Sequence, residues 1–559
     1  MADRQYDRAR GIVLGAACGD ALGWPQELRG GIVGGQKVRE SREPIAEFTP
    51  WVRTARYRQT RYHDEVRAGE YSDDTQLLIA TARACLHGDR WFDRLVGVEL
   101  PMWPVYQRGG GGAVLRAAAA WAGQTPPWRA SHRQRSGSQI KRYRDAGANG
   151  VAMRIAPHAI YSTAPNQLVE RVITDGLATH GHPRALVGAL TYAHLVAYAM
   201  RSTTLLGYGE LLNHAADSLI PADEAIRLLP KDWGLPSDID DFQQTWTQTN
   251  EEMRRLIDIV EASVGRGSLS SPTETLINLG CGDPSVNGAG TVTAAGALYL
   301  ASRFAARPET GLVTAAFLPG GDTDTLASMT GALLGAIHGQ EWLGPLARNV
   351  QDGEYLSRLA TDLVTRRSEP DLPSAQEGPA PRVFADSISL ASNNSTGKLP
   401  DGRSYRIVAI ETPSATIRRR RLETLDRQTM IVTTGLSGSN RRTDATDSSE
   451  HTRPAHTREH VVQVVLVTQN LKQCAEFYSV LLDRKDVLRG DSIEILPGLF
   501  IRSTREGEDA GGSHVIVLAV KDPEAAARRV ADQVSYTDRG TPTVNDPDGR
   551  RLILQPVHR

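Results

Sequence analysis

Two pairs of neighbouring acidic residues, each at the start of an apolar helix, constrain the fold of this chain more than any other feature. Asp322 and Asp324 follow a Gly-Gly turn and precede an apolar run from Leu326 to Ile337 with helical spacing. Asp73 and Asp74 stand in the same way before a second apolar run. The sequence therefore predicts four carboxylates at the first turns of two buried helices.

Such a cluster of carboxylates needs a partner. A helix dipole stabilises a nearby carboxylate by only about 0.3–1 kcal/mol, whereas desolvating an unpaired carboxylate costs several kcal/mol. A divalent cation is the simplest partner, and oxygen ligands favour magnesium, calcium or manganese over zinc. Helix capping at the surface needs one acid per helix rather than two beside an apolar core, so we favour the metal.

Glycines at four-residue spacing mark the first predicted helix, residues 9–21, and recur on the helix that carries Asp324. They are Gly11, Gly15, Gly19, Gly331 and Gly335. Because small residues let two helices approach closely, these two helices are expected to touch. Strand-like alternation is almost absent between about residues 6 and 366, so this region is predicted to be all-α.

The composition places the chain among ordinary globular proteins. A formal net charge of −1 argues neither for nor against nucleic-acid binding. The cysteines lack any Cys-x-x-Cys pair and are expected to be buried thiols in a reducing compartment; they are Cys18, Cys85, Cys281 and Cys474. Neither an apolar signal core nor a run of about 18 uncharged apolar residues is present, and we expect a cytoplasmic, non-membrane protein.

The 559-residue chain is predicted to be multidomain. An all-α catalytic domain is expected over residues 1–370, and a linker with short β segments over 371–459. Strand and helix patterns then alternate, so residues 460–559 are predicted to form a small α+β domain. The basic run Arg418–Arg421 lies in the predicted linker, and we favour a solvated strand or turn over phosphate binding because no aromatic residues accompany it.

Four short motifs lie in order along the N-terminal region, each at a predicted helix boundary. They are Gly15-Ala-Ala-Cys-Gly-Asp-Ala-Leu-Gly23 with Glu27 shortly after it, Ser72-Asp-Asp-Thr75, Asn149-Gly-Val-Ala-Met-Arg154 and Gly320-Gly-Asp-Thr-Asp-Thr325. This set resembles the ADP-ribosylglycohydrolase family, which includes the dinitrogenase-reductase-activating glycohydrolase. The resemblance covers roughly residues 8–350.

The resemblance implies an all-α fold with two magnesium ions in a central cleft, and hydrolysis of the bond that joins ribose C1″ of ADP-ribose to an acceptor. The implied metal ligands are Ser72, Asp73, Asp74, Asp322, Asp324 and Thr325. The implied catalytic residues are Glu27, Asp73 and Asp322, and substrate contacts are implied for Asn149, Gly150, Arg154 and His180. The chemistry is consistent, since a pair of cations about 3.5–4 Å apart can hold ribose hydroxyls and polarise water, while carboxylates stabilise an oxocarbenium-like transition state.

Some of these residues admit a structural alternative. Arg154 stands in an apolar run, so a buried ion pair competes evenly with phosphate binding. For Asp20 we favour a buried cap or a partner of the ligands over direct metal binding. For Glu27 the alternative to a role at the ribose is that it is a surface residue. The run Arg108–Gly112 is interpreted as a flexible lead into the next helix rather than as a phosphate cradle. Ala148 stands where the family often has glycine, which is expected to shift the loop there.

The C-terminal domain resembles the vicinal-oxygen-chelate family of glyoxalases and bleomycin-resistance proteins. The matching segments are Asn470-Leu, Ala475-Glu-Phe-Tyr478 and Asn545-Asp-Pro-Asp-Gly549. Gln463 and Ile553 occupy two positions where the family has metal ligands, and His514 lies near the third. Because the last carboxylate is missing, we expect a metal-free module that binds a small molecule or mediates dimerisation.

The resemblance thus implies a magnesium-dependent hydrolase of ADP-ribosylated protein, nucleic acid or small molecules. One alternative is a non-catalytic protein that binds ADP-ribose or a nucleotide in the same pocket. Another is sequestration of a small molecule by the C-terminal domain. The acceptor and the oligomeric state have no readable signature in the sequence.

Overall fold

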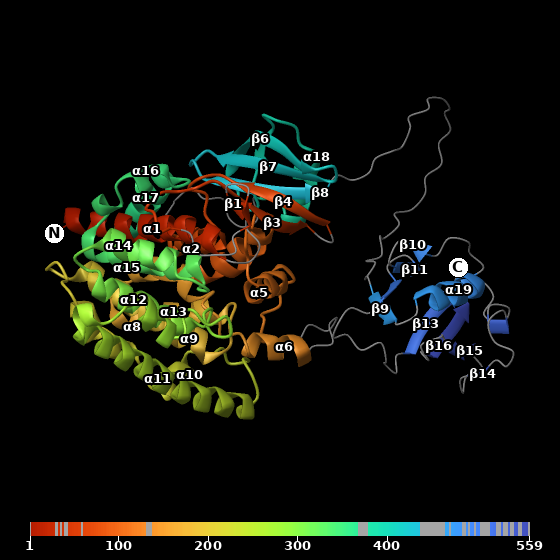
Figure 1. The fold of residues 1–559 in the computed structure, drawn as a ribbon, viewed down its shortest axis with the longest axis horizontal. Helices are drawn as coiled ribbons and strands as arrows, with labels where there is room; N and C mark the ends of the chain where they lie inside the picture. Colours follow the sequence, from red (N-terminus) through yellow and green to blue (C-terminus); the bar gives the residue numbers. More distant parts are fainter. Residues whose placement is uncertain are drawn as a thin grey trace. The chain divides into compact units, whose positions relative to one another are not determined.

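The computed structural model shows two compact units, residues 1–440 and 441–559, which are described separately (Figure 1). The residues that the structure describes are 2–27, 32–33, 36–37, 43–57, 60–129, 137–366, 378–435, 464–468, 471–482, 488–489, 492–496, 499–503, 515–520, 527–528, 535–536, 542–545 and 551–556. None of the helices described there is both long enough and apolar enough to cross a membrane.

Two glycine-bearing helices, α1 (Ala2–Gly23) and α15 (Thr323–His338), run side by side in the first unit (Figure 1). A Cβ atom added to Gly15 would lie 2.2 Å from the carbonyl oxygen of Gly331, and one added to Gly19 would lie 2.1 Å from that of Ala327. The backbones are therefore in direct contact, which confirms the helix contact expected from the glycine spacing.

Further helices surround this central pair. The helix α2 (Asp73–Cys85) packs against α1 and α15, and α9 (Pro183–Arg201) and α13 (Gly290–Arg303) pack against α15. The other helices of eight residues or more in this part are α5 (Gly112–Ala122), α6 (Gly137–Arg144), α8 (Pro165–Leu177), α11 (Pro236–Gly265), α14 (Pro308–Ala316) and α17 (Gly353–Thr365). Shorter helices are α3 (Trp91–Arg94), α4 (Leu100–Met102), α7 (Ala156–Tyr161), α10 (Ala222–Arg227), α12 (Pro272–Asn278) and α16 (Pro345–Asn349).

The prediction of an all-α N-terminal region is wrong for the described strands between residues 32 and 66. The strands β3 (Trp51–Tyr57) and β4 (Thr60–Val66) form an antiparallel hairpin, extended by the short strands β1 (Ile32–Val33) and β2 (Gln36–Lys37). The hairpin could not be recognised in the sequence, because charged residues stand at inward positions where a strand usually has apolar ones. Asp64, for example, is buried on β4, and it is ion-paired with Arg53 of β3.

The segment predicted as a linker over 371–459 contains a further folded part of the first unit. The helix α18 (Pro381–Leu390) precedes an antiparallel sheet of β5 (Thr396–Lys398), β6 (Ser404–Ser414), β7 (Ile417–Thr424) and β8 (Thr429–Gly435), in that order. We call residues 381–435 the cap. Figure 1 shows its sheet beside the β3–β4 hairpin, and β4 contacts β6 while β3 contacts β8.

The inner face of the cap packs on α2. Leu77 and Ala84 of α2 share one apolar cluster with Phe384 of α18 and with Ile407 and Val432 of the sheet. Burial of this apolar surface makes the cap part of the same folded body as the helices.

The second unit contains two four-stranded sheets. One has the order β10 (Leu488–Arg489), β11 (Ser492–Leu496), β12 (Leu499–Ser503), β9 (Val464–Thr468), and α19 (Leu471–Leu482) contacts it. The other has the order β13 (Val515–Val520), β16 (Arg551–Pro556), β15 (Pro542–Asn545), β14 (Ser535–Tyr536). These elements agree with the predicted α+β class, while Gln463, His514 and most of the predicted helix 523–534 lie outside the described residues.

Candidate functional site

The glycine contact between α1 and α15 brings together the ends of these helices that carry acidic residues. A Cβ atom on Gly23 would lie 2.1 Å from the carbonyl oxygen of Thr323, and the Thr323 hydroxyl donates to the Gly23 carbonyl at 2.9 Å. A short 3-10 helix, Trp24–Gln26, then leads to Glu27. As a result, carboxylate oxygens of Glu27, Asp322 and Asp324 lie within 4.8 Å of one another.

The second acidic pair begins α2. Ser72 is the N-cap of this helix, and its hydroxyl accepts a hydrogen bond from the Asp74 N–H at 3.2 Å. Asp73 and Asp74 follow in the first turn and are almost completely buried. We call Glu27, Asp73, Asp74, Asp322 and Asp324 the acidic site.

Each acidic pair raises pKa values in the other pair. Burial and the charge of Asp20 raise the pKa of Asp73 to about 7, with a further contribution from Asp322. Burial, Asp20, Asp73 and Asp322 raise the pKa of Asp74 well above its usual value. Burial, Glu27 and then Asp74 do the same for the pKa of Asp324. Carboxylates from helices about 250 residues apart in sequence therefore destabilise one another's charged forms.

The atoms of the acidic site fit a hard divalent cation. The Thr325 hydroxyl hydrogen-bonds the carboxyl group of Asp74, but the Oδ2 atom of that group is buried without a hydrogen-bond partner among the described residues. An unpartnered buried carboxylate oxygen beside other carboxylates is unfavourable unless a proton or a cation joins it. The set consists of oxygen donors alone, which suits magnesium or manganese better than zinc.

Asp20 holds the start of α2 in place. Its carboxylate accepts hydrogen bonds from the Ser72 N–H at 3.0 Å, the Thr75 N–H at 3.0 Å and the Thr75 hydroxyl at 2.6 Å. Asp20 is thus the buried cap that the sequence favoured, and it fixes the two residues that flank Asp73 and Asp74.

Asn149 reaches the acidic site from a loop between α6 and α7. Its side-chain N–H donates to Asp322 Oδ2 at 3.0 Å and to Thr293 Oγ1 at 3.1 Å. Ala148 forms an isolated antiparallel bridge with Ala289, and its side chain is exposed, so an alanine is accommodated at this position. Asn149 therefore orients a carboxylate of the acidic site.

His180 lies beneath the turn at Gly150. A Cβ atom on Gly150 would lie 3.0 Å from His180 Cε1, and His180 Nδ1 is 2.7 Å from the Thr179 hydroxyl. Burial, aided by the charge of Arg154, lowers the pKa of His180 to about 3, so its imidazole is neutral. Its expected contact with substrate stays a prediction.

Arg154 has a structural role in this fold, and its expected contact with substrate stays a prediction. It is fully buried and forms an ion pair with Asp175 at 2.7 Å. Its guanidinium also donates to the Gly150 carbonyl and, at 2.9 Å, to the Thr179 hydroxyl. The buried ion pair, one of the two alternatives from the sequence, is the one observed, and through Gly150 it supports the turn beside the acidic site.

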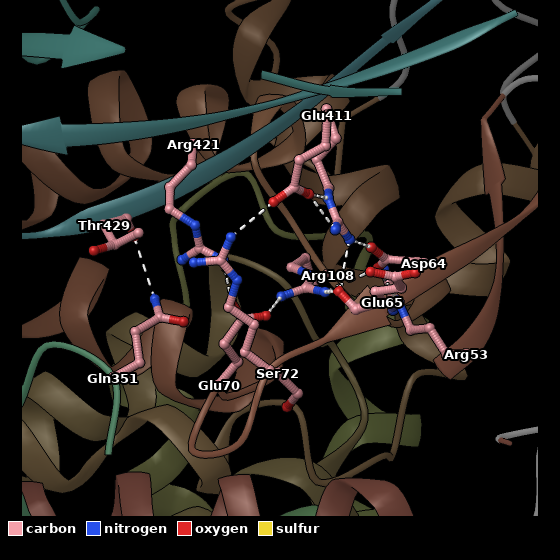
Figure 2. Close-up of polar contacts among 12 residues, drawn as sticks. Arg53, Asp64, Glu65, Glu70, Ser72, Arg108, Gln351, Glu411, Arg421 and Thr429 are labelled. Atoms are coloured by element: carbon pink, nitrogen blue, oxygen red, sulfur yellow. Dashed lines mark hydrogen bonds and ion pairs between the residues drawn. The ribbon is translucent and has the colours of Figure 1, made fainter. Parts of the chain in front are cut away.

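Two arginine-containing motifs have roles that the sequence did not predict. Arg108 is buried between Glu70 and Asp64, at 2.5 Å and 3.0 Å, rather than forming a flexible lead into α5. Of the run Arg418–Arg421, the first residue is exposed, whereas Arg419 and Arg420 are buried. Figure 2 shows Arg421 extending from β7 toward Glu70, with which it is ion-paired. The expectation of a solvated strand is therefore wrong for three of the four arginines, because acids of other elements pair with Arg419 and Arg421, and Arg420 donates to carbonyl and hydroxyl oxygens of residues 389–434.

Comparison with known proteins gives three findings. The family model described as ADP-ribosylglycohydrolase matches residues 1–373. A chain of a solved structure described as an "ADP-ribosylglycohydrolase-related protein complex" is 22% identical, with a TM-score of 0.41, over 66% of this chain and 100% of that chain. No curated protein matches the sequence. The cap and the second unit lie beyond the end of the family match.

Proposed function

Because the chain belongs to the ADP-ribosylglycohydrolase family, we propose that it is a magnesium-dependent hydrolase of ADP-ribosylated substrates. The bond cleaved joins ribose C1″ to an acceptor. The observation that carries the proposal is the meeting of the α2 and α15 acids at one buried site beside Glu27.

Two magnesium ions are proposed to be held by Ser72, Asp73, Asp74, Asp322, Asp324 and Thr325. All of these residues lie at the N-terminal turns of α2 and α15. When bound, the cations would hold the ribose hydroxyls and polarise a water molecule. The unpartnered Oδ2 atom of Asp74 supports the assignment, because a cation satisfies an oxygen that no described residue satisfies.

Glu27 is the proposed acid–base residue. Glu27 and Asp322 are half-buried, whereas Asp324 is buried, and Asp322 is already held by Asn149, so Glu27 is the carboxylate proposed to act on the substrate. Cleavage at C1″ places positive charge on the ribose, which nearby carboxylates stabilise, and the leaving atom must gain a proton. Asn149 keeps Asp322 in the orientation that this arrangement needs.

A cavity of about 490 Å³ between α5 and α6 is proposed to receive the anionic part of the substrate. Arg116, Arg142 and Thr179 are among its lining residues, and Thr179 contacts His180. Val114 of α5 would lie 3.5 Å from a Cβ atom on Gly150, so the cavity wall adjoins the turn that carries Asn149. Guanidinium groups bind phosphate oxygens well, and Arg116→Ala is expected to raise KM while changing kcat little.

The proposal is tested with ADP-ribosylated arginine, serine and DNA and with O-acetyl-ADP-ribose, each assayed with magnesium and with a chelator. We expect magnesium-dependent release of ADP-ribose from at least one substrate. Asp324→Asn should reduce the rate by about a hundredfold or more, because it removes a ligand, and loss of a residue that merely supports a ligand already costs about 10–100-fold. Asp258→Asn, at an exposed position on α11, is the matched control.

Two outcomes would contradict the proposal. In the first, the wild-type protein binds ADP-ribose but releases none from any substrate, which would favour a non-catalytic binding protein. In the second, activity is unchanged by the chelator and by Asp324→Asn.

A further inference from the structure

We propose that Arg421 of the cap is a positioning residue for the acidic site, acting through Glu70 on the loop that leads into Ser72, Asp73 and Asp74. This inference rests on the proposed metal centre. It adds that a segment outside the family match, residues 381–435, supplies part of the support for the ligands.

The first link is an ion-paired chain of buried groups. Glu70 is 4% exposed, and its two carboxylate oxygens bind different arginines, Oε1 with Arg421 and Oε2 with Arg108. Arg108 and Arg419 in turn share Asp64, which is 1% exposed. Figure 2 shows Arg421, Glu70, Arg108 and Asp64 between the strands of the cap and the loop that carries Ser72. A carboxylate held on both oxygens, here by the buried guanidinium of Arg108 and the half-buried guanidinium of Arg421, has little freedom to move.

A second link joins the cap to the same loop. The Thr429 N–H of β8 donates to Asp352 Oδ2 at 2.9 Å, and the Tyr71 hydroxyl donates to the same oxygen at 2.7 Å. The Gln351 N–H donates to the Gly69 carbonyl at 2.9 Å, and its side chain donates to the Thr429 carbonyl at 3.4 Å. Every residue from Gly69 to Tyr71 is therefore connected, directly or through one residue, to the cap.

A third link reaches the acidic site from the other side of Arg108. Gly109, with a φ of +104°, lies so close to Asp73 that an added Cβ atom would be 2.7 Å from Asp73 Oδ1. The Arg108 guanidinium also lies 5.4 Å from the ring centroid of Trp24, three residues before Glu27. Arg108 thus contacts segments that lead to both halves of the acidic site, and Arg421 fixes Arg108 through Glu70.

These contacts fix the position of the loop that precedes the proposed metal ligands. Residues 67–72 lie outside the helices and strands and have one turn, closed by the hydrogen bond from the Glu70 N–H to the Arg67 carbonyl at 3.1 Å, so their positions depend largely on the groups that hold them. Glu70 is two residues from Ser72 and three from Asp73. If Arg421 is lost, a buried carboxylate loses one of its two partners, and the loop is expected to move where it meets α2.

The strand β7 provides its own controls. Arg418 is exposed, and Arg420 is buried but donates to the Ser389 and Ala391 carbonyls and to the Thr434 hydroxyl, all within the cap. Arg418→Gln therefore tests the loss of a surface charge. Arg420→Gln tests the loss of a buried arginine that does not contact the loop. Arg421→Lys keeps the charge and loses the planar fork of donors.

The experiment measures Mn²⁺ binding to the full chain by electron paramagnetic resonance, at a temperature where circular dichroism shows every variant folded. We expect Arg421→Gln to weaken Mn²⁺ affinity about tenfold, within the range found when groups that support metal ligands are lost. Arg421→Lys should recover part of the affinity. Arg418→Gln and Arg420→Gln should bind as the wild type does, although Arg420→Gln should unfold at a lower temperature.

The inference is overturned if Arg421→Gln binds Mn²⁺ as tightly as the wild type, or if Arg420→Gln weakens binding equally. Either result leaves the metal centre itself standing. If the wild-type protein binds no Mn²⁺, the metal centre of the proposed function fails and the inference fails with it.

Discussion

At Asp74, the burial of a carboxyl group is unfavourable for stability, and the proposed cation binding would offset this. Its carboxyl group is buried beside other acids, and one of its oxygens has no partner among the described residues. In the absence of a cation, burial and the charges of Asp20, Asp73 and Asp322 raise the pKa of this group, so its charged form is disfavoured. Functional sites often carry such unfavourable groups, because the ligand supplies what the fold does not.

Asp74→Asn is expected to stabilise the metal-free protein and to abolish its response to magnesium. Removing one of several buried like charges relieves repulsion, while removing a ligand oxygen weakens cation binding. The midpoint of thermal unfolding is measured with chelator and with millimolar magnesium. We expect the variant to unfold at or above the wild-type temperature in chelator and to gain nothing from magnesium. A wild-type-sized gain in the variant would show that Asp74 is not a ligand, and Asp258→Asn serves as the surface control.

At the scale of elements, the sequence predicted the helices that are marked by small residues and by pairs of acids. It did not predict the strand that is stabilised by ion pairs between residues far apart in the chain. The glycine spacing predicted the contact between α15 and α1, and the acidic pairs predicted where α2 and α15 begin. The strand β7 did not follow, since Ile417-Arg-Arg-Arg-Arg-Leu422 reads as solvated charge. Its buried arginines are satisfied by Asp64 and Glu70, more than 300 residues earlier, and by groups within the cap. The sequence around β7 contains no pattern that identifies partners so far away in the chain.

The close contact between α1 and α15 predicts that one added methyl group at Gly15 lowers the free energy of unfolding. In Gly15→Ala the new Cβ atom would lie 2.2 Å from the Gly331 carbonyl oxygen, so α1 and α15 must separate. Such overpacking costs about 1–3 kcal/mol or more. Gly97→Ala is the matched control, because no atom lies within 4 Å of its added Cβ and the helical backbone favours alanine by about 1 kcal/mol. Urea unfolding should show a loss of stability for the first variant and none for the second, and equal stabilities would contradict the packing described.

The contact between the cap and α2 is expected to weaken in acid. Burial acts to raise the pKa of Asp401, but the charges of Arg403 and Arg83 outweigh it and hold the pKa at about 2. Because this pKa is below the unfolded value of about 4, the carboxylate stabilises the fold above pH 4, and the contribution is lost as the pH falls toward 2. The difference in unfolding free energy between the wild type and Asp401→Asn should therefore be largest near neutral pH and shrink in acid. A difference that stays constant from pH 6 to pH 2.5 would contradict this electrostatic account.

At the scale of the molecule, the cap belongs to the same folded body as the family-matched helices. The family match ends at residue 373, whereas the compact unit extends to residue 440. The sequence placed this boundary too early because polar residues between about 368 and 381 resemble the start of a linker.

Two shortened chains test this boundary. Residues 1–440 are expected to be soluble and to unfold in a single transition, because the apolar cluster shared by α2 and the cap is intact. Residues 1–373 should aggregate, since removal of the cap exposes Leu77, Leu95 and Trp103, among others. Size-exclusion chromatography and calorimetry provide the comparison. A soluble, cooperatively folded chain ending at residue 373 would show that the cap is dispensable for folding.

Two acidic pairs far apart in the chain are proposed to converge and to hold divalent cations. The most direct measurement is anomalous diffraction from crystals soaked in Mn²⁺. We predict anomalous peaks between the N-termini of α2 and α15, within ligand distance of carboxylate oxygens from both helices. Crystals that contain Mn²⁺ only elsewhere, or that show Asp73 and Asp322 directed away from each other into solvent, would contradict the account.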